Sequence, residues 1–464
     1  MHKNAHIYFI GIGGIGMSAL ARYFKLQGKT VSGYDRSESA LTRQLEAEGI
    51  QVHYKEDPGQ VPEDPECVVY TPAIPDTHLE LQYCRERKYS LLKRSEVLGW
   101  ITRQSYNICV AGTHGKTTIS TLTAHILRHS GTGCNAFLGG ISVNYGTNFW
   151  NHENNVCVME ADEYDRSFLK LYPDIAVISA MDADHLDIYG DLAALEAAFL
   201  AFAGQIKAGG QLLLKYGLKR GSDFRSEKKS TYSLDDSNAD HYARSIVPWQ
   251  GGYRFDVVLQ EKVVADVHLA VGGIHNVENT VAAMAVAHCM EVPVDKIKAA
   301  VAAFQGVRRR FEYIIPSGAD AEGLVMIDDY AHHPEELSSL IRSGRGLFPG
   351  KTCTIVFQPH LFSRTRDLAA EFGAALDLAD EVILLPIYPA REQPLPGVTS
   401  ELVLQHMQNQ SRQVMDKQQL LEWLTSADHQ ERLLLFAGAG DIDALVQPVK
   451  QLLTKKHQAE QLRQ

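Results

Sequence analysis

A glycine-rich turn between an apolar segment and a helical pattern constrains the fold of this chain more than any other feature. The apolar segment covers residues 106–111, and the turn after it consists of Gly112, Thr113, His114, Gly115, Lys116, Thr117 and Thr118. Apolar residues then recur at helical spacing from Ile119 to Leu127. Backbone N–H groups at such a turn and at the following helix N-terminus point toward an anion, so the pattern predicts a strand, a phosphate-binding loop and a helix.

Two side chains of this loop fit ATP chemistry. Lys116 can place a positive charge on the β and γ phosphates, and the Thr117 hydroxyl can hold Mg2+. The full phosphate-loop pattern has a glycine five residues before Gly115, where this chain has Val110. The alternative is a structural turn with an incidental lysine, and the helical spacing after the turn favours the nucleotide-binding interpretation.

Short apolar runs alternate with helical segments along the chain, which predicts parallel sheets with crossover helices. We expect a helix over 14–26 and strands at 6–10, 30–34, 67–70, 106–111, 156–159, 175–179, 211–214, 324–327, 353–357, 381–385 and 433–436. Between about 232 and 271 the apolar residues alternate with period two, at Phe255, Val257 and Leu259 and then at Val263, Ala265, Val267 and Leu269. That alternation predicts a small antiparallel insert.

The length of 464 residues fits about three domains. We therefore predict an α/β protein with a Rossmann-like N-terminal domain over 1–105 and a central P-loop-type ATPase domain over 106–311, which carries the insert. A C-terminal Rossmann-like domain is predicted over 312–464.

The charge balance and the cysteines narrow the functional class. The 56 acidic and 45 basic residues give a net charge of −11, which disfavours nucleic-acid and anionic-membrane partners. The seven cysteines include no CxxC pair and suggest neither a disulfide framework nor a zinc site. The apolar start over 7–20 is rich in glycine and lacks a convincing cleavage site, so a cytoplasmic protein is expected.

A second glycine-rich turn lies at the N-terminus. Gly11, Gly13, Gly14, Ile15 and Gly16 stand between an expected strand and helix, and Asp35 follows the next strand. The pattern predicts a diphosphate site at the helix N-terminus, with the carboxylate on a ribose hydroxyl. It leaves NAD, FAD and UDP-sugars open, and tight strand–helix packing is the structural alternative.

Acidic segments follow two neighbouring central strands. Residues 160–165 read EADEYD and residues 182–187 read DADHLD. Carboxylates at the carboxyl ends of parallel strands beside a phosphate loop can hold a metal ion that bridges ATP oxygens. Solvated strand ends are the alternative, and the neighbouring Lys116 favours Mg2+.

Basic and polar turns mark the last third of the chain. Arg308, Arg309 and Arg310 close the central domain, where guanidinium groups can reach a γ-phosphate on domain closure. Dense polar turns over 328–334 and 358–366 follow two expected strands, and their position suggests a binding edge of that sheet.

Together these motifs resemble the Mur ligase family of peptidoglycan synthesis, whose members use ATP to form amide bonds on a UDP-sugar. The resemblance covers nearly the whole chain in the family's order, through GIGGIGMSALA, AGTHGKTT, EADEYD, DADHLD, GIHNVENTVAA, FQGVRRRF, DDYAHHP and FQPHLFSRTRDL. The first and the last two motifs most resemble the branch that adds L-alanine to UDP-N-acetylmuramate. The murein-peptide recycling branch shares several motifs and is the alternative within the family.

The resemblance implies a division of labour. The first domain would hold UDP-N-acetylmuramate through Gly11, Gly13, Gly14, Ile15, Gly16, Asp35, Thr71 and Ala73. The central domain would bind ATP through the loop from Gly112 to Thr118, with His275, Asn276 and Asn279 facing adenine, and would bind Mg2+ through Thr117, Glu160 and His185. Asp329 would contact the nucleotide ribose, while Tyr330, His332 and Arg364 would bind L-alanine. Lys116, Arg309, Arg310, His332 and Arg364 would be the catalytic residues of a monomer or homodimer.

Three departures from the family pattern bear on these roles. Ala180 stands where the family often has Asn, and Leu361 stands where some alanine-adding members have Arg. Residues 186–206 contain no lysine, whereas members that add later residues use a carbamylated lysine on this helix. The missing lysine agrees with the alanine-adding branch, and Leu361 leaves Arg364 as the expected carboxylate ligand.

Two other classes remain as alternatives. A nicotinamide-dependent oxidoreductase would account for the glycines over 11–16, but it would leave Lys116 and the acidic turns without a purpose. A non-catalytic nucleotide switch would account for the phosphate loop, but it does not require the polar turns of the last third.

Overall fold

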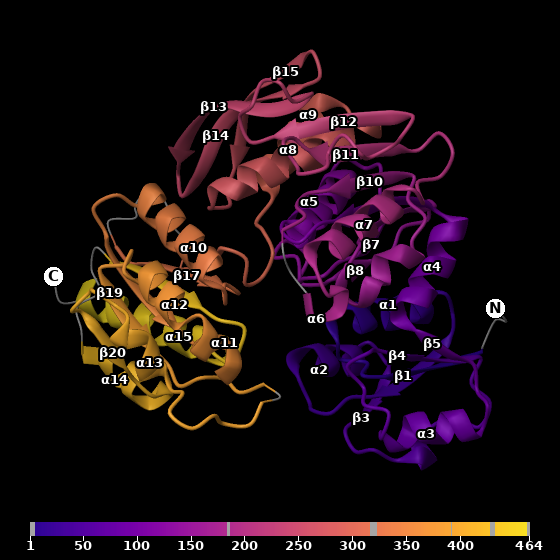
Figure 1. The fold of residues 1–464 in the computed structure, drawn as a ribbon, viewed down its shortest axis with the longest axis horizontal. Helices are drawn as coiled ribbons and strands as arrows, with labels where there is room; N and C mark the ends of the chain where they lie inside the picture. Colours follow the sequence, from indigo (N-terminus) through magenta and orange to yellow (C-terminus); the bar gives the residue numbers. More distant parts are fainter. Residues whose placement is uncertain (1–4, 183–185, 316–322, 391, 427–431, 462–464) are drawn as a thin grey trace. The chain divides into compact units, whose positions relative to one another are not determined.

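The computed structural model describes residues 5–182, 186–315, 323–390, 392–426 and 432–461. These residues form three sheets and divide into two compact units (Figure 1). Unit 1 contains Met1–Arg244, Asp256–Val267 and Glu278–Ala303, and unit 2 contains Ser245–Phe255, His268–Val277 and Phe304–Gln464. The predicted α/β class is confirmed, because parallel strand pairs joined through helices occur in all three sheets.

The first sheet has five parallel strands in the order β3-β2-β1-β4-β5. Its strands are β1 His6–Ile10, β2 Thr30–Tyr34, β3 Gln51–His53, β4 Cys67–Tyr70 and β5 Leu91–Lys93. Its helices are α1 Ile15–Leu26, α2 Ala40–Ala47, η1 Pro58–Gln60, α3 Leu79–Glu86 and α4 Arg94–Gln104. β1 is buried almost throughout because strands flank it on both sides, which explains its continuous apolar sequence.

The second sheet has ten strands in the order β15-β14-β13-β12-β11-β10-β6-β9-β7-β8. Its strands are β6 Tyr106–Ala111, β7 Asn135–Phe137, β8 Phe149–Trp150, β9 Val156–Glu160, β10 Ile175–Ile178, β11 Gln211–Lys215, β12 Lys228–Ser233, β13 His241–Trp249, β14 Gly252–Leu259 and β15 Lys262–Leu269. Its helices are α5 Lys116–His129, η2 Tyr164–Lys170, α6 Leu186–Tyr189, α7 Leu192–Ala203, α8 Ile274–Cys289 and α9 Val294–Ala303. The phosphate loop lies between β6, in the interior of this sheet, and α5.

The segment predicted as an insert supplies β13, β14 and β15, which extend the central sheet beyond β12. β13 pairs in parallel with β12 through Tyr232 and His241. In β15 the predicted face is wrong for Val263, which is 45% exposed, whereas Val264 is buried. Asp266 has a φ of 57°, so the backbone leaves strand geometry there and the buried face changes along the strand.

The third sheet has six strands in the order β16-β17-β21-β18-β19-β20, and only β16 runs antiparallel to its neighbour. Its strands are β16 Glu312–Ile315, β17 Val325–Asp329, β18 Thr352–Phe357, β19 Glu381–Leu384, β20 Arg412–Val414 and β21 Arg432–Ala437. Its helices are α10 Pro334–Leu347, α11 Phe362–Asp367, α12 Ala369–Leu376, α13 Ser400–Gln405, α14 Lys417–Ser426 and α15 Asp443–Gln461. The polar turns over 328–334 and 358–366 thus follow β17 and β18.

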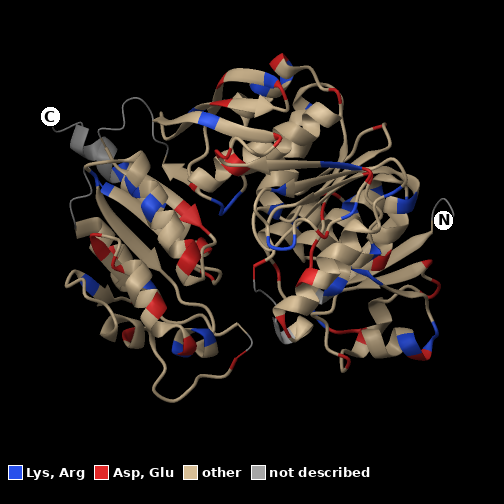
Figure 2. Cartoon of the chain, turned by 45° about the horizontal axis from the view of Figure 1, so that its top comes forward, with Lys and Arg blue, Asp and Glu red and all other residues tan. Residues whose placement is uncertain are grey.

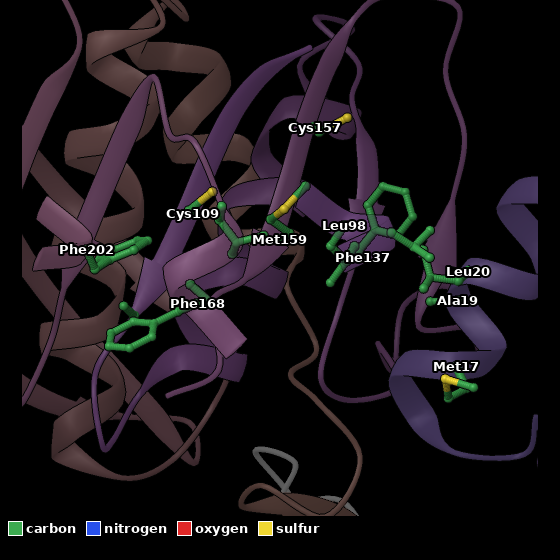
Figure 3. Close-up of a cluster of buried hydrophobic side chains, with 14 of the residues drawn as sticks. Met17, Ala19, Leu20, Leu98, Cys109, Phe137, Cys157, Met159, Phe168 and Phe202 are labelled. Carbon is green, nitrogen blue, oxygen red and sulfur yellow. The ribbon is translucent and has the colours of Figure 1, made fainter. Parts of the chain in front are cut away.

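One continuous apolar core joins the first two sheets inside unit 1. It runs from Leu20 through Phe137 to Phe202 (Figure 3). Phe9 and Phe149 belong to the same core. A polar contact also connects the two sheet regions, because Arg22 Nη1 on α1 donates to Asn148 Oδ1 at 2.7 Å. Within the described ranges no helix has the length and apolar character needed to span a membrane.

Candidate active site

The loop from Gly112 to Thr118 has a backbone that requires glycine at two positions. Gly112 has a φ of 135°, and a Cβ there would lie 2.2 Å from Ser179 Oγ. Gly115 has a φ of 81° and is the N-cap residue of α5. Other residues rarely adopt such angles, so glycine sets the turn that presents the first N–H groups of α5. The phosphate loop is therefore formed without a glycine at Val110.

The turn is also held by contacts to the loop after β10. Thr113 N–H donates to the Ala180 carbonyl at 3.1 Å, and the Thr113 hydroxyl accepts from Asp182 N–H at 3.1 Å. His114 lies more exposed, with Nε2 at 3.6 Å from an Asp182 carboxylate oxygen. Ala180 takes part through its backbone, so the replaced Asn side chain is not needed for this contact.

Lys116 is the cation of the loop, and its side chain is only 13% exposed. Its Nζ donates to the Gly112 carbonyl and to Glu163 Oε1, both at 2.7 Å. Burial alone would lower the pKa of Lys116, but the carboxylates of Glu163, Glu160 and Asp162 raise it above its ordinary value. Lys116 is therefore fully charged at neutral pH. Figure 2 shows basic residues interspersed with acidic ones over both units. The positive charge at the phosphate loop is therefore that of Lys116 itself and not part of a large basic region.

Oxygen ligands for a divalent cation lie next to this lysine. Thr117 is the second residue of α5, and Glu160 ends β9, which pairs with β6 next to the loop. A Cβ at Gly139 would lie 2.1 Å from Glu160 Oε2, so only glycine at position 139 leaves room for the Glu160 carboxylate. His185, the third predicted metal ligand, lies outside the described residues.

This donor set fits Mg2+, which binds through few protein oxygens together with substrate phosphates. Among the described residues, which leave out His185, no group of three or more His, Cys, Asp or Glu side chains is placed to hold a metal ion.

The start of α8 carries the residues predicted to face adenine. A Cβ at Gly115 would lie 2.7 Å from Asn279 Oδ1, so Asn279 is packed against the phosphate loop itself. Asn276 is buried, and its side-chain amide donates to the Gly272 carbonyl at 2.7 Å. His275 is exposed. The structure thus places Asn279 at the loop, whereas Asn276 holds the turn before the helix.

The N-terminal glycine turn joins the ends of three strands in unit 1. Gly11 has a φ of 86°, and a Cβ there would lie 3.0 Å from the Thr71 methyl group, just after β4. Ala73 is exposed in the same loop. Gly11 N–H and Ile12 N–H both donate to the Tyr34 carbonyl at the end of β2.

Asp35 is bound directly to this turn. Its Oδ2 accepts from Gly13 N–H at 2.7 Å, and a Cβ at Gly13 would lie 2.8 Å from the same oxygen. Gly14 is the N-cap of α1, and Ile15 and Gly16 are its first two residues. The predicted diphosphate residues are therefore brought together around one helix N-terminus.

In unit 2, Arg309 is held by acidic groups of the same unit. Its Nε lies 3.5 Å from Asp328 Oδ2 and its Nη1 lies 3.7 Å from Asp443 Oδ2. Its Nη2 also donates to the Gly438 carbonyl. Burial raises the pKa of Asp328 to about 7, against the opposing effect of Arg309. These contacts indicate that Arg309 stabilises the structure around the polar turn over 328–334.

Arg310 and Asp329 differ in their surroundings. Arg310 is exposed, with its guanidinium carbon 5.4 Å from the Tyr330 ring centroid. Asp329 accepts from Phe311 N–H at 2.7 Å and from Ala331 N–H at 2.8 Å. Arg310 is therefore better placed than Arg309 to reach an anion, while Asp329 fixes the turn that carries Tyr330.

His332 is a neutral imidazole with a defined tautomer. Its Nδ1 lies 2.9 Å from the Tyr330 carbonyl oxygen, which can only accept, so Nδ1 carries the hydrogen. Burial lowers the pKa of His332, although Glu336 opposes this effect. The other nitrogen, Nε2, is then a hydrogen-bond acceptor and a potential base.

Arg364 and His360 complete this polar turn. Arg364 Nη1 and His360 Nδ1 are both buried without a hydrogen-bond partner in the part of the chain that the structure describes. The His360 ring lies 6.1 Å from His332 and stacks at 5.8 Å on Tyr388. Burial is the main cause that lowers the pKa of His360 to about 4, and the neighbouring His332 and Arg364 side chains also disfavour a protonated His360 ring.

Three residues with a place in these sites were missed from the sequence. Glu163, His360 and Tyr388 touch Lys116 or the His332 turn. Glu163 and His360 belong to motifs that the sequence analysis recognised, so their position beside predicted site residues could have identified them. Tyr388 lies in an irregular segment after β19 and carried no sequence signal.

Comparison with known proteins identifies three family segments in the chain. Residues 6–106 match the Mur ligase family, catalytic domain, and residues 110–287 match the Mur ligase middle domain. Residues 309–440 match the Mur ligase, glutamate ligase domain. Together these matches cover well over half of the chain.

Curated relatives and solved structures are similar over almost the full length. The UDP-N-acetylmuramate–L-alanine ligase of Cytophaga hutchinsonii is 45% identical over 460 residues, covering 97% of each chain. The enzyme of the same name from Porphyromonas gingivalis strain W83 is 47% identical over 457 residues, covering 96% of this chain and 98% of its own. The crystal structure of the UDP-N-acetylmuramate–alanine ligase of Thermotoga maritima has a TM-score of 0.82 at 26% identity, covering 98% of this chain and 99% of its own. A murein peptide ligase from Psychrobacter arcticus, at 22% identity and a TM-score of 0.69, shares the fold.

Proposed function

The chain belongs to the Mur ligase family, and from that premise we propose that it joins L-alanine to the carboxylate of UDP-N-acetylmuramate. It is an ATP-dependent carboxylate–amine ligase of peptidoglycan synthesis. The observation that carries this conclusion is identity of 45–47% over nearly the whole chain with relatives named for that reaction.

The reaction requires an activated carboxylate, because a carboxylate does not condense with an amine unaided. Transfer of the γ-phosphoryl group of ATP gives an acyl phosphate, and the alanine amine then displaces phosphate from it. Catalysis of such a transfer depends mainly on positioning and charge neutralisation. Lys116 is suited to this task because it is charged, mostly shielded from solvent and fixed at the N-terminus of α5.

Mg2+ is the metal that we assign to this site, with Thr117, Glu160 and His185 as its protein ligands. The support is the all-oxygen pair of Thr117, in the phosphate loop, and Glu160, at the end of the strand β9 that pairs with β6. Mg2+ bound there would neutralise charge on the phosphates. The Gly112–Thr118 loop with Asn279 would hold the triphosphate, and His275, Asn276 and Asp329 remain proposed nucleotide ligands.

The other substrates are assigned to the remaining turns. UDP-N-acetylmuramate would lie on the N-terminus of α1, with Asp35, Thr71 and Ala73 around it. L-Alanine would be held by Arg364, Tyr330 and His332. Arg310 would neutralise the transferred phosphoryl group, while the acidic partners of Arg309 favour a supporting role for that residue.

A direct test measures phosphate release with ATP, Mg2+ and UDP-N-acetylmuramate. L-Alanine and the tripeptide L-Ala-γ-D-Glu-diaminopimelate are compared as amine substrates. The proposal requires release with L-alanine and little with the tripeptide, whereas the reverse order would assign the chain to the recycling branch.

His332 is proposed to accept the proton of the alanine amine. Because burial lowers its pKa, the ring is neutral above that value and loses its base function only in acid. In single-turnover amide formation we expect His332→Gln to be slower and to lose one ionisation from the acid limb of the pH profile. The ionisation of alanine itself would remain in the variant. An unchanged rate and pH profile would exclude this role.

Amino-acid selection should be modest against glycine and serine. Alanine exceeds glycine by one methyl group, whose burial is worth about 1–3 kcal/mol, or about 10–200-fold in kcat/KM. We expect slow but measurable ligation of glycine and serine in a steady-state assay. Equal kcat/KM for all three amino acids would contradict a fitted alanine pocket.

We further propose functional domains over 1–105 for the UDP-sugar, 106–311 for ATP and 312–464 for the amino acid and domain closure. The three family segments have similar limits. A cytoplasmic monomer or homodimer is proposed, in keeping with nucleotide substrates and the absence of CxxC pairs from the sequence.

A further inference from the structure

Arg94 links the two nucleotide-binding regions of unit 1. It is the first residue of α4, and its Nη2 lies 3.5 Å from Asp162 Oδ2 in the acidic segment after β9. The side chains of Arg94 and Asp162 are 22% and 36% exposed, so the pair is open to solvent on one side. None of the sequence motifs includes this arginine.

The other side of the guanidinium group lies on the glycine turn. A Cβ at Gly16 would be 2.8 Å from Arg94 Nη1 and 3.1 Å from Arg94 Cδ. A Cβ at Gly14, by contrast, would meet nothing closer than 3.4 Å. Glycine at position 16 therefore makes room for the arginine, a reason that differs from the usual close packing of helix on strand.

This contact places the positive charge of the Arg94 guanidinium group at the N-terminus of α1. Gly16 is the second residue of α1, and the first N–H groups of a helix have no acceptor within the helix. Such N–H groups attract phosphate, and a guanidinium group adds a fork of donors that matches phosphate oxygens.

We propose that Arg94 is a direct ligand of the diphosphate of the nucleotide-sugar substrate and that Asp162 orients its guanidinium group. This inference rests on the proposed function, because that function supplies a UDP-sugar as the ligand of α1. Arg94 also separates the diphosphate from the Asp162 carboxylate. Its removal would leave two like charges facing one another.

The test measures binding to the full-length protein by calorimetry, using UDP and UDP-N-acetylmuramate. Arg94→Ala is expected to weaken both by about 10- to 100-fold, the range for hydrogen bonds to a charged group. Uridine, followed by ligand-observed NMR, should bind wild type and variant alike because it has no phosphate. Adding Asp162→Asn to Arg94→Ala should restore part of the lost affinity, because the repulsion is removed.

Arg103, on the same helix, is the matched control. It is stacked on Tyr172 at 4.9 Å and lies near the other end of α4. Arg103→Ala should bind UDP as wild type does, and the single variants Arg94→Ala and Arg103→Ala should bind a non-hydrolysable ATP analogue within about 2-fold, which verifies the fold.

Two outcomes would overturn the inference: unchanged UDP affinity in Arg94→Ala, or an equal loss for uridine and UDP, which marks a structural residue. Failure of wild type to bind UDP-N-acetylmuramate would instead reject the proposed function.

Discussion

Replacing Lys116 with alanine is expected to reduce ligation to a small fraction of the wild-type rate. The lysine is the cation of the phosphate loop, and its loss leaves charge on the transferred phosphoryl group without a fixed counter-charge. Loss of one such electrostatic contact costs about 10²–10³-fold in kcat, or roughly 3–4 kcal/mol. Phosphate release dependent on UDP-N-acetylmuramate and L-alanine measures the effect. Ligation retained at the wild-type rate would rule out the proposed mechanism.

The buried partner of Lys116 requires a control. The Glu163 side chain has no exposed surface, so Lys116→Ala also removes the ion pair of a buried carboxylate, at a cost of about 3–5 kcal/mol in stability. The double variant Lys116→Ala with Glu163→Gln removes the charge as well. We expect it to unfold at a higher temperature than Lys116→Ala and to remain inactive, which separates the loss of catalysis from the loss of stability.

Replacing Arg364 with alanine is expected to raise the KM for L-alanine by about 100-fold or more. Arg364 carries a buried Nη1 without a partner among the described residues, and Leu361 supplies no second cation. A charge-assisted hydrogen bond to a carboxylate contributes about 1.5–3 kcal/mol, and a paired contact contributes more. Steady-state kinetics with varied L-alanine measure KM, while the KM values for ATP and UDP-N-acetylmuramate should stay near those of wild type.

Arg366 provides the matched control on the same short helix. Its side chain is 54% exposed and is paired with the neighbouring Asp367 at 2.7 Å. Arg366→Ala should leave the KM for L-alanine unchanged. If the two arginine variants behaved alike, the carboxylate of alanine would have to be bound elsewhere.

Much of the fold follows from local patterns. The strands over 6–10, 30–34 and 67–70 were predicted with their observed limits, because they are short segments that alternate with helical patterns, as parallel strands with crossover helices do. The glycine turn at 112–118 was recognised despite Val110, because backbone conformation at Gly112 and Gly115 decides the turn. Short edge strands such as β3 and β20 carry too few apolar residues to be recognised.

Side-chain partners across the chain could not be predicted in the same way. Arg309 and Arg310 are adjacent, yet one is held by Asp328 and Asp443 while the other is exposed. The left-handed backbone at Asp266 changed the buried face of β15, and period-two alternation does not reveal such a residue. These features depend on tertiary contacts that sequence spacing does not encode.

The core shared by the first two sheets also affects how this chain can be recombined with its relatives. Aromatic residues of the second sheet, Phe137 and Phe149, pack on Tyr23 of α1, and Asn148 receives a hydrogen bond from Arg22. A chimera that exchanges only the first hundred residues would therefore have to preserve both the aromatic packing and the hydrogen bond between the two sheet regions. A junction after α9 would keep both sheets of this core in one piece, because unit 1 ends at Ala303, but it would also have to match Ser245–Phe255 and His268–Val277, which belong to unit 2. Amino-acid specificity could then be transplanted with the last third of the chain, while the two nucleotide-binding regions stay together.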